Sequence, residues 1–255
     1  MSQHRSKSEP YILAAPNGAR RGAADHPALP VTTSQILEAA RACHEAGAAG
    51  LHLHIRDTEG RHSLDAGQYL ETLAELRRRV PALDIQITTE AAGIFDVSSQ
   101  FECLKKVRPA WASISVSEIA RDNDLADRIY GLCADQGTRV QHILYDAEDA
   151  ALLTRWQYRG VVRKQQSDRL LVLGRYRTDQ ESKPSDLDAF PDGDSPWMIC
   201  AFGKREHDCL IHAASLGGDV RVGFENSIAD RNGDTWDNNA ASVAALVARL
   251  KEDRS

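Results

Sequence analysis

The chain contains 255 residues, of which 42% are hydrophobic and 27% charged, a composition that allows a sizeable buried core. Its 31 basic and 37 acidic residues give a formal net charge of −6, which argues against a nucleic-acid-binding surface. The sequence has no run of about 18 apolar residues and no apolar signal region at its N-terminus, so we expect a cytoplasmic protein without a membrane segment.

Residues 1–9 are predicted to be a flexible polar tail, and residues 10–255 a single catalytic domain. The cysteines are odd in number and form no CxxC pair, which predicts buried free thiols in a reducing compartment. They are Cys43, Cys103, Cys133, Cys200 and Cys209.

Short β-rich runs alternate with longer amphipathic runs along the chain. The predicted strands are Tyr11–Pro16, Gly50–Arg56, Asp84–Thr89, Trp111–Val116, Arg139–Tyr145, Leu170–Tyr176, Trp197–Phe202 and Val220–Phe224. This rhythm indicates repeated βα units, which form either a closed barrel or a doubly wound sheet. The turn after the first strand reads PNGARR rather than GxGxxG, and the sequence has no P-loop. We therefore predict an α/β fold, a single-domain (β/α)₈ TIM barrel.

Four helices are predicted from apolar spacing and from start or stop signals: Ser34–Ala46, Ala66–Val80, Leu125–Gln136 and Asn238–Lys251. Between the sixth and seventh strands lies a polar, turn-rich segment, Thr178–Pro196. A barrel would place this segment at its catalytic rim, where it could fold over the site.

The strongest local motif is HLHIRD at residues 52–57. In a strand, residues two apart share a face, so His52, His54 and Arg56 are predicted to point into the barrel together. Buried imidazoles need partners, and a metal ion satisfies two of them at once. The alternative is a pair of hydrogen-bonded core histidines.

The last strand offers a third ligand. Arg221, Gly223 and Glu225 share one face by the same alternation, and a closed barrel brings this strand near the second one. Glu225 would complete a His₂Glu site with an open fourth position, as in catalytic zinc sites. Arg221 would hold a substrate carboxylate, or alternatively form an internal salt bridge with Glu225.

Other polar side chains fall at predicted strand ends, where they suit an oxygen-rich ligand or serve as structural hydrogen-bonding groups. They are Asn17, Thr88, Thr89, Glu90, Ser113, Ser115, Tyr145, Arg175 and Lys204.

Several segments together resemble a known family, the β-keto acid cleavage enzymes. The similarity runs in order from about Tyr11 to Leu250, and its paired HLHIRD and RVGFEN motifs are specific. It is carried by ILAAPNGARR, PALPVT, AGAAGLHLHIRD, IQITTEAAG, VLGRY, GGDVRVGFENS and NNAASVAAL.

The resemblance implies a zinc-dependent (β/α)₈ barrel, usually a homotetramer, that transfers an acyl group from a β-keto acid to CoA. Acetyl-CoA is consumed, and acetoacetate and a new acyl-CoA are formed. Residue by residue, His52, His54 and Glu225 match the zinc ligands, and Arg221 matches the active-site arginine. Thr88 falls where the family has a serine or threonine, and Ser113 where it has a threonine.

The sequence departs from the family where the family has carboxylates. Asn226 replaces the general base that follows the ligand glutamate, and an amide cannot take up a proton at pH 7. The stretch that includes Gln141 and Ile143 lacks the expected glutamate, and Arg20 stands where an acidic residue is expected. Glu90, by contrast, replaces a glycine-type position. We therefore predict that Glu90 or a metal-bound hydroxide is the base.

Two other classes of function remain open at this stage. A metal-dependent hydrolase or lyase would use the same His₂Glu centre without CoA, although amidohydrolase barrels carry HxH on their first strand. A barrel that binds a keto acid or a metal without turnover is the non-enzymatic alternative, and it is suggested by Asn226 alone.

Overall fold

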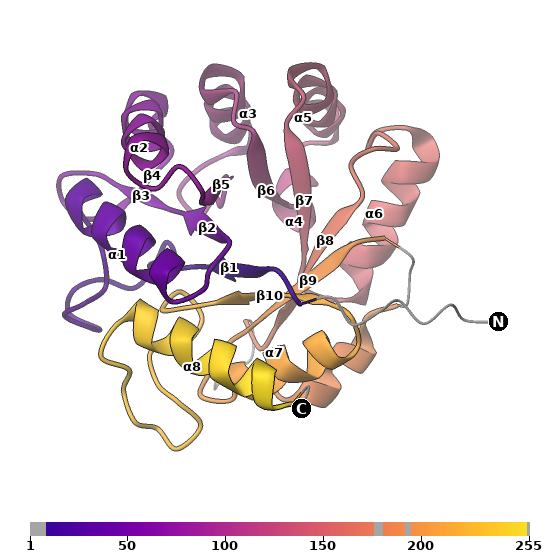
Figure 1. The fold of residues 1–255 in the computed structure, drawn as a ribbon. Coiled ribbons are helices and arrows are strands. Elements are labelled where there is room, and N and C mark those ends of the chain that lie inside the picture. The colour runs from indigo at the N-terminus through magenta and orange to yellow at the C-terminus, as the bar shows by residue number, and fades with distance from the viewer. Residues whose placement is uncertain (1–8, 176–180, 192–194, 254–255) are drawn as a thin grey trace.

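The computed structural model describes residues 9–175, 181–191 and 195–253, and within these ranges the strands close into a parallel barrel (Figure 1). Each barrel strand pairs in register with two neighbours, and β1 pairs with both β10 and β2 to complete the ring. The barrel strands are β1 (Ile12–Ala14), β2 (Gly50–Leu53), β5 (Asp84–Thr88), β6 (Trp111–Ser115), β7 (Arg139–Leu144), β8 (Asp168–Leu173), β9 (Trp197–Ala201) and β10 (Asp219–Val222). The predicted barrel is confirmed.

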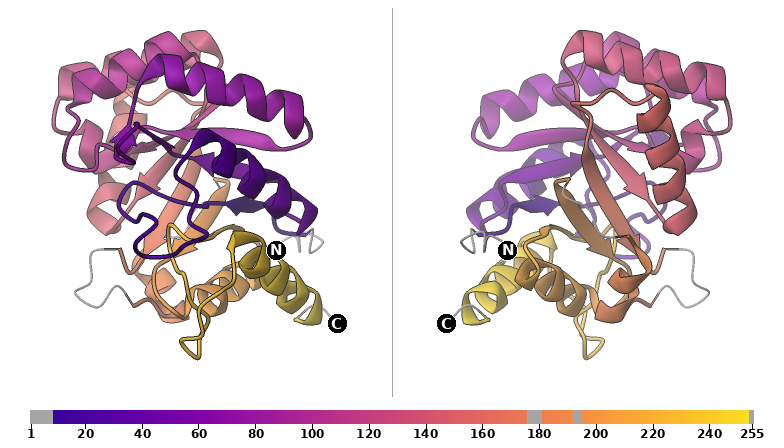
Figure 2. Two further views of the ribbon diagram at one scale, coloured as in Figure 1. Left: turned by 90° about the vertical axis from the view of Figure 1, so that its left-hand side faces the viewer. Right: turned by 90° about the vertical axis from the view of Figure 1, so that its right-hand side faces the viewer.

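Helices surround the strands, as the two side views also show (Figure 2). The last helix lies between α1 and α7, so the first and last helices of the chain are neighbours in the outer layer (Figure 1). The helices are α1 (Thr33–Glu45), α2 (Ala66–Arg79), α3 (Val97–Val107), α4 (Val116–Ile119), α5 (Asn123–Gln136), α6 (Ala147–Arg159), α7 (Glu206–Ser215) and α8 (Asn239–Glu252), with a 3₁₀ helix η1 (Pro184–Ala189).

The four predicted helices are observed with ends shifted by at most two residues, and their caps explain where they begin. Thr32 and Gln35 form a capping box before α1, and Asp122 caps α5. Helices α3, α4 and α6 were not predicted, and for α7 the sequence indicated only a helical pattern around His207 and His212 without bounds. Helix α4 has only four residues, too few for a periodic pattern to show.

The predicted strand Gly50–Arg56 is wrong beyond Leu53. The barrel strand β2 ends there, and Ile55–Arg56 forms β3, which pairs antiparallel with β4 (His62–Ser63) outside the barrel. The guanidinium of Arg56 donates to the carbonyl oxygens of Gly18, Arg21 and Gly60 rather than pointing to the barrel axis. This side chain fixes the loop after β1.

The last strand is also shorter than predicted, because β10 ends at Val222 instead of Phe224. Gly223 has a φ of +142°, and a Cβ atom there would lie 2.5 Å from the carbonyl oxygen of Ala15. Only glycine fits this close approach, so the chain leaves the strand and turns across the mouth of the barrel.

Apolar side chains fill the inside of the barrel below the mouth, among them Leu13, Leu170, Met198 and Cys200. A larger core lies between strands and helices. All five cysteines are buried and free, as predicted. Among the described residues, no helix is long and apolar enough to cross a membrane.

Two predictions concern residues that the structure does not describe. The predicted tail covers residues 1–9, of which only Glu9 is described. The sixth predicted strand ends at Tyr176, which lies outside the described residues. The rim segment Thr178–Pro196 is described only in part, and that part contains η1.

Candidate active site

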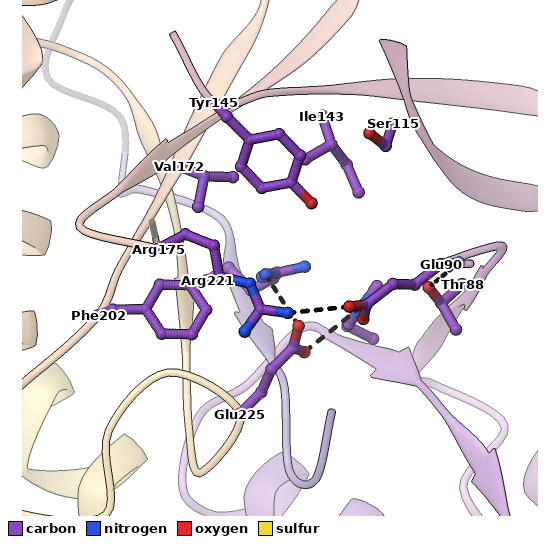
Figure 3. Close-up of a pocket in the computed structure, with 11 residues that line it drawn as sticks. Thr88, Glu90, Ser115, Ile143, Tyr145, Val172, Arg175, Phe202, Arg221 and Glu225 are labelled. Carbon is purple, nitrogen blue, oxygen red and sulfur yellow. Dashed lines mark hydrogen bonds and ion pairs between the residues drawn. The ribbon is translucent and has the colours of Figure 1, made fainter. Parts of the chain in front are cut away.

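Polar side chains from six barrel strands or the residues after them meet at the carboxyl end of the barrel, where the catalytic sites of this architecture lie. Figure 3 shows how they face one pocket. Its lining consists of His52, Thr88, Glu90, Ser115, Ile143, Tyr145, Val172, Arg175, Phe202, Arg221 and Glu225.

The two histidines and the glutamate of the predicted metal site converge. Nε2 of His52 lies 3.1 Å from Nε2 of His54, although His54 follows the end of β2. Oε2 of Glu225 lies 3.5 Å from Nε2 of His52 and 3.8 Å from Nε2 of His54. One atom from each residue therefore faces a common point, and the three form a candidate metal site.

These distances fit a small tetrahedral ion. Ligand bonds of about 2.0–2.2 Å separate the ligand atoms by roughly 3.3–3.6 Å, close to the spacing observed. Oε2 of Glu225 is buried and has no hydrogen-bond partner within the described part of the chain. A buried carboxylate oxygen without a donor is costly, and a cation in front of it would remove that cost. The residues present therefore fit a divalent metal.

Arg221 determines which oxygen of Glu225 is left for a metal. Nη2 of Arg221 lies 3.3 Å from Oε1 of Glu225 and 3.2 Å from Sγ of Cys200. The salt bridge considered as an alternative role for Arg221 is therefore present, and it directs Oε2 toward the histidines. Burial alone would raise the pKa of Glu225, but the charge of Arg221 brings it below its usual value, so the group is a carboxylate at pH 7.

Gln86 fixes the orientation of His52. Its Oε1 lies 2.7 Å from Nδ1 of His52, which assigns the ring proton to Nδ1 and leaves the lone pair of Nε2 for a metal. Gln141 accepts from Nε2 of Gln86 at 3.0 Å and continues this chain of side chains across the barrel. Burial, followed by the charge of Arg221, lowers the pKa of His52 to about 4, and burial holds the pKa of His54 well below its ordinary value. Both imidazoles are neutral at pH 7, as metal ligation requires.

Glu90 stands beside the metal site on the loop that follows β5. Its Oε2 lies 3.9 Å from Nε2 of His54, and its Oε1 accepts from Nη2 of Arg175 at 2.9 Å (Figure 3). Burial and the neighbouring carboxylate of Glu225 raise the pKa of Glu90 to about 7, against the opposing charge of Arg175. His62 fixes the backbone here, because its Nε2 lies 2.8 Å from the carbonyl oxygen of Glu90.

The threonines and serines of the predicted site fall at different depths. Thr88 lines the pocket, and its Oγ1 accepts from the backbone N–H of Glu90 at 3.0 Å. Thr89 points away from the pocket and donates to the carbonyl oxygen of Ser113. The side chain of Ser113 is fully buried and is not part of the lining, whereas Ser115, one step nearer the mouth on the same face, is.

Four further predicted residues divide into two that line the pocket and two that do not. Tyr145 and Arg175 line the pocket, and the guanidinium of Arg175 stacks over the ring of Phe202. Asn17 donates to the carbonyl oxygens of Pro30 and His54, so it supports the ligand loop from behind. Lys204 is exposed and is not part of the pocket lining.

Asn226 follows the ligand glutamate but does not face the pocket. It is fully buried, and its Nδ2 donates to Oε1 of Glu206 at 3.0 Å and to the carbonyl oxygen of Arg221 at 3.2 Å. A carboxylate oriented like this side chain would not reach a substrate.

Three residues that support the site, Gln86, His62 and Glu206, were not predicted from the sequence. Gln86 had a usable signal, because it shares the inward face of its strand with Thr88. His62 and Glu206 had none, since a hairpin and a helix terminus bring them to the site.

A closed (β/α)₈ barrel with two neutral imidazoles, two carboxylates and two arginines at its catalytic end defines an enzyme of the metal-dependent TIM-barrel class. The profile of the β-keto acid cleavage enzymes matches residues 10–253, and the chain belongs to this family.

Relatives span almost the whole chain. A 3-keto-5-aminohexanoate cleavage enzyme of Fusobacterium nucleatum is 25% identical, and the alignment covers 94% of this chain and 91% of that enzyme. A 3,5-dioxohexanoate:acetyl-CoA acetone transferase of Paraburkholderia graminis is 26% identical over 94% of this chain and 89% of its own. The solved complex of ObcA with oxaloacetate superposes with a TM-score of 0.62 at 17% identity, covering 90% of this chain but only 65% of ObcA, and supports the fold alone.

Proposed function

We propose that this protein transfers the acyl group of a β-keto acid to CoA, with acetyl-CoA as the second substrate. The bond between the keto carbon and the neighbouring methylene carbon breaks. The acyl group joins the sulfur of CoA, and the methylene carboxylate fragment joins the acetyl group to give acetoacetate. The observation that carries this proposal is the convergence of His52, His54 and Glu225 at the barrel mouth, together with family membership.

We propose that the ion held by these three residues is zinc, which would stabilise negative charge that develops on the keto oxygen. Arg221 and Arg175 supply fixed positive charges on the pocket wall for the substrate carboxylate. Thr88 and Tyr145, which also line the pocket, are proposed to bind substrate oxygens, and Ile143 and Val172 offer an apolar wall to the rest of the acyl chain.

Glu90 is proposed as the base that removes a proton from the methylene carbon. Its carboxyl group lies in the pocket beside His54, whereas Asn226 has no proton-accepting group at pH 7 and faces away. Arg175, which pairs with Glu90, keeps this carboxyl group directed into the pocket. Thr89, Ser113 and Asn17 then act by supporting the loops of the site rather than by touching the substrate.

The wider setting of the enzyme follows from the same resemblance and from its thiols. We propose residues 10–255 as the catalytic domain, a homotetrameric assembly, and the cytoplasm as the compartment. The buried free cysteines support the last of these.

An assay with acetyl-CoA and a panel of β-keto acids tests the activity. Zinc-loaded protein is expected to form acetoacetate and a new acyl-CoA from at least one panel member, and to form neither when acetyl-CoA is omitted. Turnover that proceeds equally without CoA would show a hydrolase or lyase instead. Absence of product across the panel would remove the transferase proposal.

A thermal unfolding experiment tests the metal separately. Zinc at one hundred times its Kd should stabilise the fold by about 2.7 kcal/mol, which raises Tm by about 5–10 °C for a chain of this size. His52→Ala should abolish the shift, whereas His212→Ala, on the outer helix α7, should retain it. An equal shift in both variants would place the zinc elsewhere.

A further inference from the structure

The turn that carries Glu225 is held by a separate partner at each backbone N–H. Gly223 donates to Oε1 of Glu206 at 3.1 Å, and Phe224 donates to Oδ1 of Asn239 at 2.9 Å. Glu225 itself donates to the carbonyl oxygen of Ala15 at 3.1 Å. The turn is therefore fixed from β1, α7 and α8 at once.

Glu206 makes two of the contacts around this turn. It is the first residue of α7 and is fully buried, and its Oε1 accepts from the backbone N–H of Gly223 and from Nδ2 of Asn226. These donors stand two residues before and one residue after Glu225. A single carboxyl oxygen thus links both sides of the ligand.

Burying a carboxyl group costs free energy unless its oxygens are hydrogen-bonded. Oε2 of Glu206 has no hydrogen-bond partner in the described ranges, so this cost is only partly offset and a purely structural role does not account for the residue. Burial raises the pKa of Glu206 to about 8, and the hydrogen bonds from Asn226 and Gly223 act in the opposite direction. The two donors require only an oxygen with two lone pairs, and the side-chain oxygen of a glutamine at this position would provide the same.

We propose that Glu206 is a positioning residue that holds the turn of Glu225 in place, so that the carboxylate oriented by Arg221 faces the histidine pair. The inference rests on the metal centre of the proposed function and is independent of which substrate is used. Glu206 does not touch the metal position itself. It acts through Gly223 and Asn226, and it explains why residue 226 carries an amide that faces inward to the barrel wall instead of a group in the pocket.

Two substitutions of similar volume separate hydrogen bonding from packing. Glu206→Gln keeps an oxygen that can accept from Gly223 and Asn226, whereas Glu206→Met fills the same space without an acceptor. Zinc affinity is measured for the full chain by competition with a chromophoric chelator. The methionine variant should bind zinc 10–100-fold more weakly than wild type, the usual effect of losing a group behind a metal ligand, and the glutamine variant should bind like wild type.

Glu118 in α4 provides a matched control. Its Oε2 accepts from the backbone N–H of Ala91 at 2.8 Å and from Nε2 of Gln100 at 3.0 Å, so it makes the same kinds of hydrogen bonds on another wall of the mouth. Glu118→Met should lower the Tm of the metal-free protein but leave zinc affinity unchanged. Equal zinc affinity in Glu206→Met and wild type, or equal losses in the two methionine variants, would overturn the proposal.

If Glu206→Met is insoluble, Asn226→Ala tests the proposal instead, because it removes one of the two donors to Oε1 of Glu206 and leaves the carboxyl group in place. Weaker zinc binding in this variant would support the proposal, and unchanged binding would overturn it. Failure of the acyl-transfer assay has no bearing on this readout. Failure of wild type to bind zinc would instead reject the metal centre on which both proposals depend.

Discussion

Arg221 and Glu225, four residues apart around the turn after β10, share one hydrogen bond that gives the two oxygens of the carboxylate different partners. Nη2 of Arg221 holds Oε1 of Glu225, and Oε2 is left facing His52 and His54. Both side chains are at least nine-tenths buried. The arginine therefore compensates the charge of the ligand and also fixes its direction.

Removing Arg221 is expected to destabilise the metal-free protein more than the zinc-loaded one. Arg221→Met leaves Glu225 buried without a counter-charge, which costs about 3–5 kcal/mol. Bound zinc supplies a cation to the same carboxylate and should reduce this loss. Urea unfolding with and without zinc measures the difference. Arg205→Met, which breaks a surface ion pair with Asp208, serves as the control and should change stability by less than about 1 kcal/mol in both states. Identical losses for Arg221→Met in the two states would contradict this account.

Gln86→Leu is expected to weaken zinc binding 10–100-fold. The side chain of Gln86 holds the proton of His52 on Nδ1, and without it the ring can rotate or present the wrong nitrogen. Gln141→Leu, one step further from the metal, should have a smaller effect because it contacts Gln86 and no ligand. Chelator competition measures both. A Gln86 variant with wild-type affinity would show that packing alone orients the ring.

Glu90→Gln should lower kcat by about 10²–10⁴-fold while leaving zinc affinity unchanged, because it removes a proton acceptor and no ligand. Asn226→Asp should not restore activity to this variant, since residue 226 faces Glu206 and not the pocket. Steady-state kinetics of the single and double variants make the comparison. Recovery of activity in the double variant would show that an acidic side chain at position 226 can act as the base, and would contradict this assignment.

Asp208 is expected to make stability depend on pH at the junction of α7 and α8. Its carboxylate accepts from Arg249 at 2.8 Å and lies 3.5 Å from Arg205. Burial would raise the pKa of Asp208, but the arginines hold it below its ordinary value of 3.8. A lowered folded-state pKa means that the stabilisation is present above pH 3.8 and is lost as pH falls through the folded value.

Asp208→Asn should therefore be less stable than wild type by a constant amount from pH 5 to pH 8, and the two should converge below pH 4. Urea titrations at several pH values follow this, with Asp135→Asn, an exposed site on α5, as the control. A difference that grows as the pH falls would have the wrong sign for this interpretation.

The predicted convergence of His52, His54 and Glu225 is observed, although the predicted strands were longer than those in the structure. Alternation predicted that His52 and His54 share a face, yet His54 lies beyond the end of β2 and Glu225 lies beyond the end of β10. They meet because the segments after β2 and β10 bring these side chains to the same point, and Gly223 permits the turn that carries Glu225. The side chains therefore converge as predicted, but the alternation of residues along a strand is not the cause, because His54 and Glu225 lie outside the strands.

Sequence order alone determined the fold class, because alternating strand and helix patterns in a chain of this length allow few topologies. It also supplied the candidate metal ligands, since imidazoles and a carboxylate at strand ends are unusual enough to stand out. Only the tertiary structure decided which other side chains reach the pocket. Ser115 rather than Ser113 lines it, and Asn226 turns away to meet Glu206. Depth along a strand and the partners of a buried amide depend on contacts between residues far apart in the chain, and local spacing carries no record of those contacts.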